Sequence, residues 1–167
     1  MKQATIKSGF SGSEGTYLLE RTQHIGASPA EVFQFFSEPR NLARITPPSL
    51  GFKIHGDPPA QMRKGARIEY RIKWMGLSLP WVSRITDWRP GLGFQDAQEK
   101  GPYRRWVHTH SFEENAGGVT MRDTVEYALP LGVLGRVANA LVVRRQLDEI
   151  FDYRYRAIQE VFLVRSN

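Results

Sequence analysis

Two histidines, His108 and His110, are the residues whose types and spacing point most directly to chemistry. They stand two positions apart in an extended segment, and residues two apart on a strand project from the same face. Two imidazoles on one face suit an acid–base pair or a pair of metal ligands. Glu114 follows His110 by four residues, which matches only half of a two-part metal-binding motif. We therefore expect no metal ion and no other cofactor, and favour packed or hydrogen-bonded histidines.

Carboxylates on the following strand are the candidate partners of these histidines. Asp123 and Glu126 lie beyond the turn at residues 115–118, and because they are three apart they face opposite sides of a regular strand. Tyr70, on an earlier strand, is the third acid–base candidate beside His108 and His110. The sequence has no cysteine nucleophile, nucleophile elbow or phosphate-binding glycine loop. Whether the protein is an enzyme stays open, and the sequence favours a role without catalysis.

The elements that must position these residues are mostly strands. Period-two alternation and turn residues predict one strand before and six strands after a helical stretch: residues 16–25, 51–56, 66–74, 77–88, 94–99, 103–112 and 119–129. Ser28 followed by Pro29 predicts the start of a helix, and a second short helix over residues 40–45 ends before Pro47. The order is therefore one strand, two short helices, six antiparallel strands and a final helix.

The strongest helical pattern closes the chain. From Val137 onward, apolar residues recur every three or four positions: Leu141, Val143, Leu147, Ile150, Phe151, Tyr155, Ile158 and Phe162. We expect this whole stripe to be buried across the concave side of the sheet. The segment 130–135 is expected to be a glycine-rich connection between the last strand and this helix.

Composition limits the classes of protein that this chain can be. Its 167 residues suit one domain, which we place at residues 16–167 after a flexible N-terminal arm at residues 1–15. The formal charge is +6, but the basic residues are dispersed among acidic ones, so no nucleic-acid partner is expected. No transmembrane segment or signal peptide is evident, and a cytoplasmic location is expected. A homo-oligomer stays open.

Three passages give the chain its resemblance to a known superfamily: residues 25–33 with 39–42, the hairpin of residues 106–112 and 122–127, and the closing helix. In these passages the chain resembles the START-like or Bet v 1-like (SRPBCC) superfamily, within it the polyketide cyclase/dehydrase-like group. The resemblance implies an α+β helix-grip fold, in which a curved antiparallel sheet of about six or seven strands wraps around a long C-terminal helix. Two short helices follow the first strand.

That fold implies a cavity between sheet and helix, and its expected lining is largely aromatic or apolar. The candidate ligand-binding residues are Tyr70, Ile72, Trp74, Trp106, His108, His110, Phe112, Leu147, Phe151 and Tyr155. Such a lining suits a hydrophobic or aromatic small molecule or a lipid. We expect a carrier or sequestering module for such a ligand. The alternative is an enzyme resembling cyclases or dehydratases that acts through His108, His110 or Tyr70 without a redox cofactor.

Overall fold

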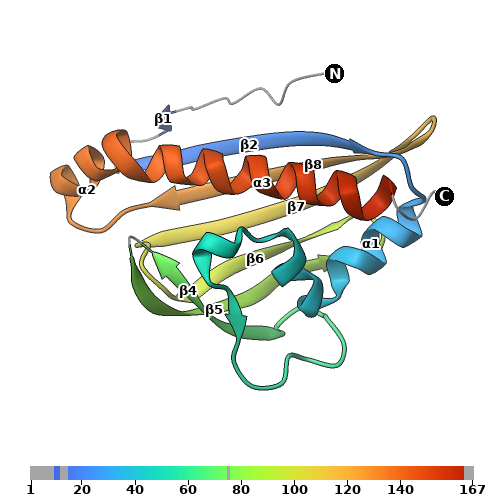
Figure 1. The fold of residues 1–167 in the computed structure, drawn as a ribbon, viewed down its shortest axis with the longest axis horizontal. Coiled ribbons are helices and arrows are strands. Elements are labelled where there is room, and N and C mark those ends of the chain that lie inside the picture. Colours follow the sequence, from blue (N-terminus) through green and yellow to red (C-terminus); the bar gives the residue numbers. More distant parts are fainter. Residues whose placement is uncertain (1–9, 12–14, 75, 164–167) are drawn as a thin grey trace.

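The computed structural model describes residues 10–11, 15–74 and 76–163 (Figure 1). Most of the predicted arm, residues 1–15, lies outside the described residues. Within it the structure describes Phe10–Ser11 as a short strand, β1, which pairs with the start of β2. The flexibility expected of the arm therefore stays a prediction.

A single antiparallel sheet carries most of the described chain. Its strands are β2 (Thr16–Ile25), β3 (Lys53–Ile54), β4 (Arg67–Trp74), β5 (Leu77–Arg89), β6 (Gly93–Lys100), β7 (Arg105–Asn115) and β8 (Gly118–Ala128), besides β1. The strand order is β1-β2-β8-β7-β6-β5-β4-β3, so the last strand, β8, returns to pair with the first long strand, β2. The strands expected from the alternation pattern are confirmed, with boundaries that differ by a few residues.

Short helices connect β2 to β3. Helix α1 (Pro29–Ser37) starts with a capping box, in which the Ser28 hydroxyl accepts from the backbone of Glu31 and the Glu31 carboxylate accepts from the backbone of Ser28. The second expected helix is a 3₁₀-helix, η1 (Pro39–Ile45), and a further 3₁₀ turn, η2 (Pro48–Leu50), follows.

The closing helix begins earlier than the pattern indicated. Helix α2 (Gly132–Ala138) continues through a π-helical segment, η3 (Asn139–Val143), into α3 (Arg144–Leu163). The expectation of a loop over residues 130–135 was therefore wrong beyond Leu131. So was the expectation that the whole stripe is buried, because Val137, Leu141 and Tyr155 are exposed. The π segment holds more residues per turn than an α-helix and so changes which side chains face the sheet.

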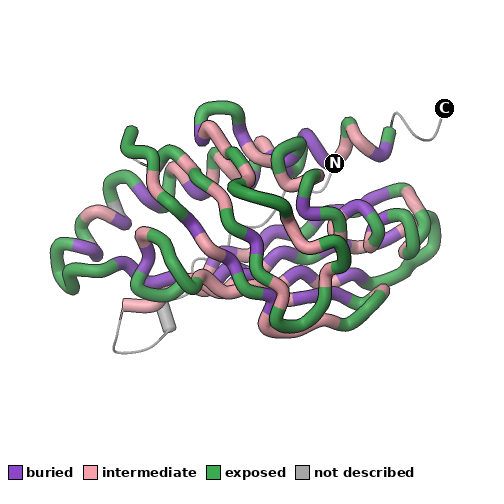
Figure 2. Tube along the Cα trace, turned by 90° about the horizontal axis from the view of Figure 1, so that it is seen from below, coloured by how far each residue is buried: buried purple, intermediate pink, exposed green. Residues whose placement is uncertain are grey.

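Helix α3 lies along the concave face of the sheet, and the short helices cover the same face further toward β4 (Figure 1). Buried residues alternate with intermediate and exposed ones along the strands and recur along α3 (Figure 2), as expected of elements that each bury one face. Two apolar clusters fill the interior, one around Phe35, Phe112 and Phe162 and one around Trp81, Tyr127 and Phe151. This arrangement is the helix-grip fold that the sequence predicted.

Candidate functional site

A cavity of about 180 Å³ lies between the inner face of the sheet, helix α3 and the η1–η2 segment. A water molecule needs about 10–15 Å³ of such space, so the cavity can hold an organic molecule. Strands β4 to β7 form its floor, because alternate side chains of each strand point to the same, inner face of the sheet. Its lining is mostly apolar and aromatic, including Ile68, Ile72, Trp81, Trp106, Leu147, Ile150 and Phe151.

A buried ionic cluster forms one part of that lining. On β7 and β8, His110 and Asp123 stand directly opposite each other, and Nδ1 of His110 lies 2.7 Å from Oδ1 of Asp123. The same carboxylate oxygen lies 3.1 Å from Nε2 of His108, and its other oxygen accepts from Nε of Arg154 at 3.3 Å. Asp123 therefore joins two strand histidines to the arginine of helix α3.

A second carboxylate extends the cluster toward β4. Oδ2 of Asp96, on β6, lies 3.6 Å from Nε2 of His110, and its Oδ1 accepts from the Ser83 hydroxyl at 3.1 Å. Ser83 also lies 3.2 Å from the hydroxyl of Tyr70 and accepts from the indole N–H of Trp81 at 3.1 Å. Strands β4 to β8 thus all contribute to one continuous polar network beneath the cavity.

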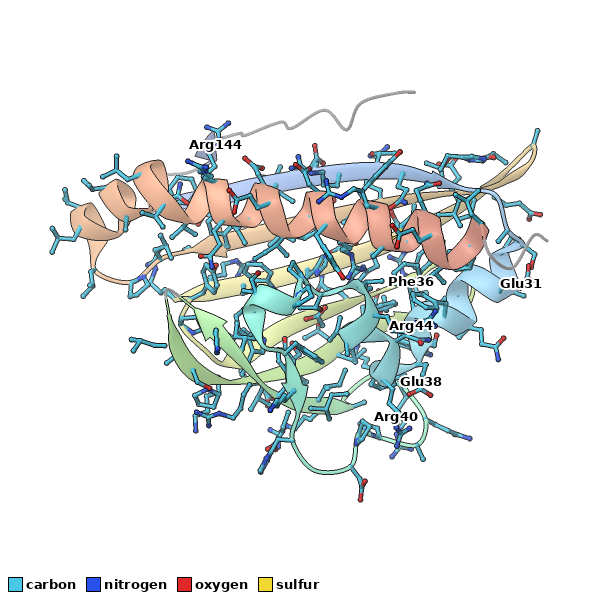
Figure 3. All side chains as sticks on the ribbon, viewed as in Figure 1. Glu31, Phe36, Glu38, Arg40, Arg44 and Arg144 are labelled. Carbon is cyan, nitrogen blue, oxygen red and sulfur yellow. The ribbon has the colours of Figure 1, made fainter. Side chains whose placement is uncertain are left out.

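Aromatic rings pack around the network. Phe94 and Phe36 flank the imidazole of His110, with centroid distances of 4.3 and 6.4 Å. The guanidinium of Arg154 lies 5.4 Å above the ring of Phe36, which Figure 3 labels between α1 and α3. The histidine, the arginine and Asp123 are all buried. In such surroundings electrostatic interactions are stronger than in water, and an unpaired charge is costly.

The two histidines have pKa values shifted in opposite directions. Burial lowers the pKa of His108, and the nearby charge of His110 lowers it further. Burial also lowers the pKa of His110, but the charge and hydrogen bond of Asp123 and the contact with Asp96 outweigh it and raise that pKa. His110 is therefore the more basic imidazole of the pair, and His108 the one that more readily stays neutral.

Both carboxylates stay ionised, despite burial that raises their pKa values. Contacts with His110 and His108 hold the pKa of Asp96 below its usual value. The charge of Arg154 contributes most to holding the pKa of Asp123 well below its usual value, and His110 and His108 add to this effect. Burial and the charge of Asp96 raise the pKa of Tyr70, so its phenol stays protonated. With His110 and Arg154 charged, two anions face two cations and the cluster is neutral overall.

Three donors of this cluster lie close enough together to hold a cation. One ligand atom each from Asp96, His108 and His110 lies within 4.8 Å of the others. Two histidines and a carboxylate are a donor set that zinc or iron accepts, and Asp123 would orient both imidazoles from behind. However, a divalent ion would have to displace the proton that balances Asp96 and Asp123 and would leave an excess positive charge beside Arg154. The charge balance therefore favours a protonated His110 over a metal ligand.

The sequence-predicted site residues divide into two groups. Seven of them border the cavity: Tyr70, Ile72, Trp106, His108, His110, Leu147 and Phe151. Two do not. Phe112 packs in the core against Phe33 and Phe36, and Tyr155 is exposed because it faces away from the sheet on α3. The side chain of Trp74 lies outside the described part of the chain. Of the proposed carboxylate partners, Asp123 meets the histidines, whereas Glu126 pairs with Arg105 and Glu114 is exposed.

Sequence reasoning missed Asp96, Ser83 and Arg154. Asp96 follows Phe94 by two positions, so strand alternation alone places it on the inner face. Arg154 stands at the spacing of the apolar stripe, three residues after Phe151 and four before Ile158. A charged residue inside an apolar stripe is a signal of a buried partner. No local pattern says that these side chains meet the histidines.

Comparison with protein families matches residues 18–162 to the family described as "Polyketide cyclase / dehydrase and lipid transport". Comparison with curated proteins gives no match. Among solved structures, TTHA0849 from Thermus thermophilus superposes with a TM-score of 0.67 at 18% identity, covering 90% of this chain and 99% of that one.

Two further solved structures are similar to this chain. Ginseng major latex-like protein 151 from Panax ginseng gives a TM-score of 0.65 at 11% identity and covers 88% of this chain and 97% of its own. Ara h 8.0201 gives 0.59 at 14% identity, with 92% and 100% covered. At such identities the likeness shows a shared Bet v 1-like fold and no more. In the described part of the chain, no helix is long and apolar enough to cross a membrane.

Proposed function

Since this chain belongs to the polyketide cyclase / dehydrase and lipid transport family, we propose that it binds a small, mainly apolar molecule between the sheet and helix α3. The observation that carries the proposal is the cavity, whose lining combines many apolar side chains with one buried polar network. Ligand sites in proteins have this composition, in which apolar area supplies affinity and a few polar groups supply orientation.

The polar network limits the kind of ligand. Its charges already balance, so a charged ligand group would leave the buried cluster with a net charge. A neutral hydroxyl or carbonyl group would instead exchange hydrogen bonds with the neutral His108 or the phenol of Tyr70, both of which border the cavity. We therefore propose an aromatic or aliphatic compound that carries a hydroxyl or carbonyl group.

Calorimetric titration with 2-naphthol tests this proposal, because 2-naphthol combines a flat apolar body with one hydroxyl group. Ile150→Phe is the test variant, since Ile150 is half-buried on α3 and borders the cavity. The larger ring fills space that the ligand needs, and we expect affinity to fall about tenfold or more. Native mass spectrometry of the purified protein adds a search for a co-purified ligand.

Leu163→Phe is the matched control, because Leu163 is exposed at the end of the same helix and outside the cavity lining. It should bind 2-naphthol like the wild type. The proposal fails if 2-naphthol, its parent hydrocarbon naphthalene and decanol all give no binding and no ligand co-purifies. Equal binding by Ile150→Phe and wild type would place the ligand outside this cavity.

Acid–base catalysis is the second candidate function, and one observation favours it. The cavity is bordered by one histidine whose pKa is lowered and one whose pKa is raised, and these shifts favour the two states that a general base and a general acid require. In this reading His110 or Tyr70 donates a proton to a carbonyl oxygen, while His108 accepts one from the same substrate. Once a substrate is known, His110→Gln should lower kcat with little change in KM, whereas a ligand carrier would lose only affinity.

A further inference from the structure

The end of the molecule formed by α2 and η3 is unusual in what it exposes. Six large apolar side chains lie between 41% and 76% exposed along twelve residues: Leu131, Val133, Leu134, Val137, Leu141 and Val142. Scattered exposed leucines are normal on protein surfaces, but a contiguous group of this kind marks an interaction site. We call these six residues the α2 patch.

The α2 patch occupies one side of the helix. Val133, Val137 and Leu141 follow one another at four-residue steps, which brings them into line along a helix. On the other side of the same helix, Asn139 and Val143 are buried, and Asn139 accepts from the hydroxyl of Tyr127 at 2.8 Å. The inner side is therefore anchored to the sheet, and the apolar outer side meets solvent.

The position of the patch leaves it accessible. Helix α2 extends past the end of the sheet, and exposed residues dominate this end of the molecule (Figures 1 and 2). The backbone that leads into it is held in an uncommon conformation, because Leu131 has a φ of 68° although it is not a glycine.

Along the chain from Leu131 to Leu147 every charged residue is basic, and one of these residues, Arg145, pairs with Glu149 at 3.1 Å. No acidic residue occurs between Glu126 and Asp148, whereas Arg136, Arg144 and Arg145 fall inside that stretch. Arg144 lies where η3 passes into α3 and is labelled in Figure 3, and both it and Arg145 are exposed. An apolar helix face with arginines and no carboxylate in its own stretch of chain is the composition of helices that lie in the interface of anionic membranes.

We propose that the α2 patch docks on the surface of a membrane that contains anionic lipids. The apolar side chains enter the boundary between headgroups and acyl chains, while Arg144 and Arg145 contact lipid phosphates. The protein lies on the bilayer and does not span it. This surface is separate from the cavity, so the proposal stands whether or not the cavity binds a ligand.

Flotation with lipid vesicles tests the docking. The wild-type protein should float with vesicles of phosphatidylcholine and phosphatidylglycerol and bind vesicles of pure phosphatidylcholine much more weakly. Leu134→Gln/Leu141→Gln removes two apolar contacts and should weaken binding about tenfold or more. Arg144→Gln/Arg145→Gln should cause a similar loss on anionic vesicles only.

Leu77→Gln/Leu92→Gln is the matched control, because these leucines are similarly exposed but lie outside the α2 patch, Leu77 at the start of β5 and Leu92 in the turn between β5 and β6. It should float like the wild type. The docking proposal is overturned if the wild type does not float, or if the control loses as much binding as the patch variant. A wild-type dimer in light scattering that becomes a monomer in Leu134→Gln/Leu141→Gln would also overturn it, since a second copy would then cover the patch.

Discussion

His110 and Asp123 are direct partners across the β7–β8 hairpin, with 2.7 Å between Nδ1 and Oδ1, and both are buried beneath the cavity. The pair is held in place by strand register, since directly opposed residues of antiparallel strands bring their side chains together on one face. Arg154 completes it from the helix side. The candidate site therefore connects the two layers of the fold electrostatically, and its perturbation should be measurable in stability as well as in binding.

Asp123→Asn should destabilise the protein by about 3–5 kcal/mol, because the change leaves Arg154 and His110 as buried cations facing only one carboxylate, Asp96. Chemical denaturation followed by fluorescence measures this loss. Glu126→Gln is the control on the same strand: its ion pair with Arg105 is about half exposed and should contribute less than about 1 kcal/mol. Similar losses in both variants would contradict the buried ion-pair network.

The pH dependence of stability should distinguish the two histidines. The pKa of His110 is raised above 6.5 in the folded protein, so the stability it contributes is fully present below pH 6.5 and is lost as pH rises through its folded pKa. The free-energy difference between wild type and His110→Gln should therefore shrink as pH increases above 6.5.

His108 should have the opposite sign. Its pKa is lowered below 6.5, so the neutral ring favours folding above pH 6.5 and that contribution is lost as pH falls toward its folded pKa. The difference between wild type and His108→Gln should therefore shrink as pH decreases below 6.5. NMR titration of the two imidazoles provides the independent check, and a single shared transition at 6.5 would refute the opposite shifts.

Gly93→Ala should disturb the site through the backbone. Gly93 has a φ of 148°, and a methyl group there would collide with the carbonyl oxygen of His110. Because that neighbour is backbone and cannot turn away, we expect a loss of about 2–4 kcal/mol and shifted His110 resonances. Gly91 also has a positive φ, but a methyl group there would meet no atom within 4 Å. Gly91→Ala should therefore lower the free energy of unfolding by only about 1–2 kcal/mol and leave the His110 resonances unchanged.

Ser28→Ala should cost about 1 kcal/mol of unfolding free energy, since it removes the hydroxyl that caps helix α1. Ser28→Thr keeps a hydroxyl at the same position and should restore most of the loss. Thermal unfolding of the three proteins measures the effect. If alanine and threonine are equally destabilising, the cap contributes nothing and α1 depends on its packing against the core alone.

Local patterns were sufficient for most of the fold. The alternation over residues 66–74, the cap at Ser28 and the apolar spacing of α3 each depend on residues a few positions apart, and all three elements are confirmed. Most of the wrong predictions concern which side chains are buried, because tertiary contacts decide that. A pattern of apolar residues cannot distinguish Val143, which is buried, from Leu141, which is exposed, because the π segment between α2 and α3 changes the facing of the helix.

The sequence by itself determined that His108 and His110 share a face, that a carboxylate follows on the next strand, and that a long helix closes a curved sheet. These conclusions rest on the periods of strands and helices, which are local. Only the tertiary structure decided that Asp123, and not Glu126, meets both histidines, and that Asp96 and Arg154 balance their charge. Such partners lie from 13 to 44 positions apart in the chain, and contacts across that distance depend on strand order and helix placement, which no local pattern encodes.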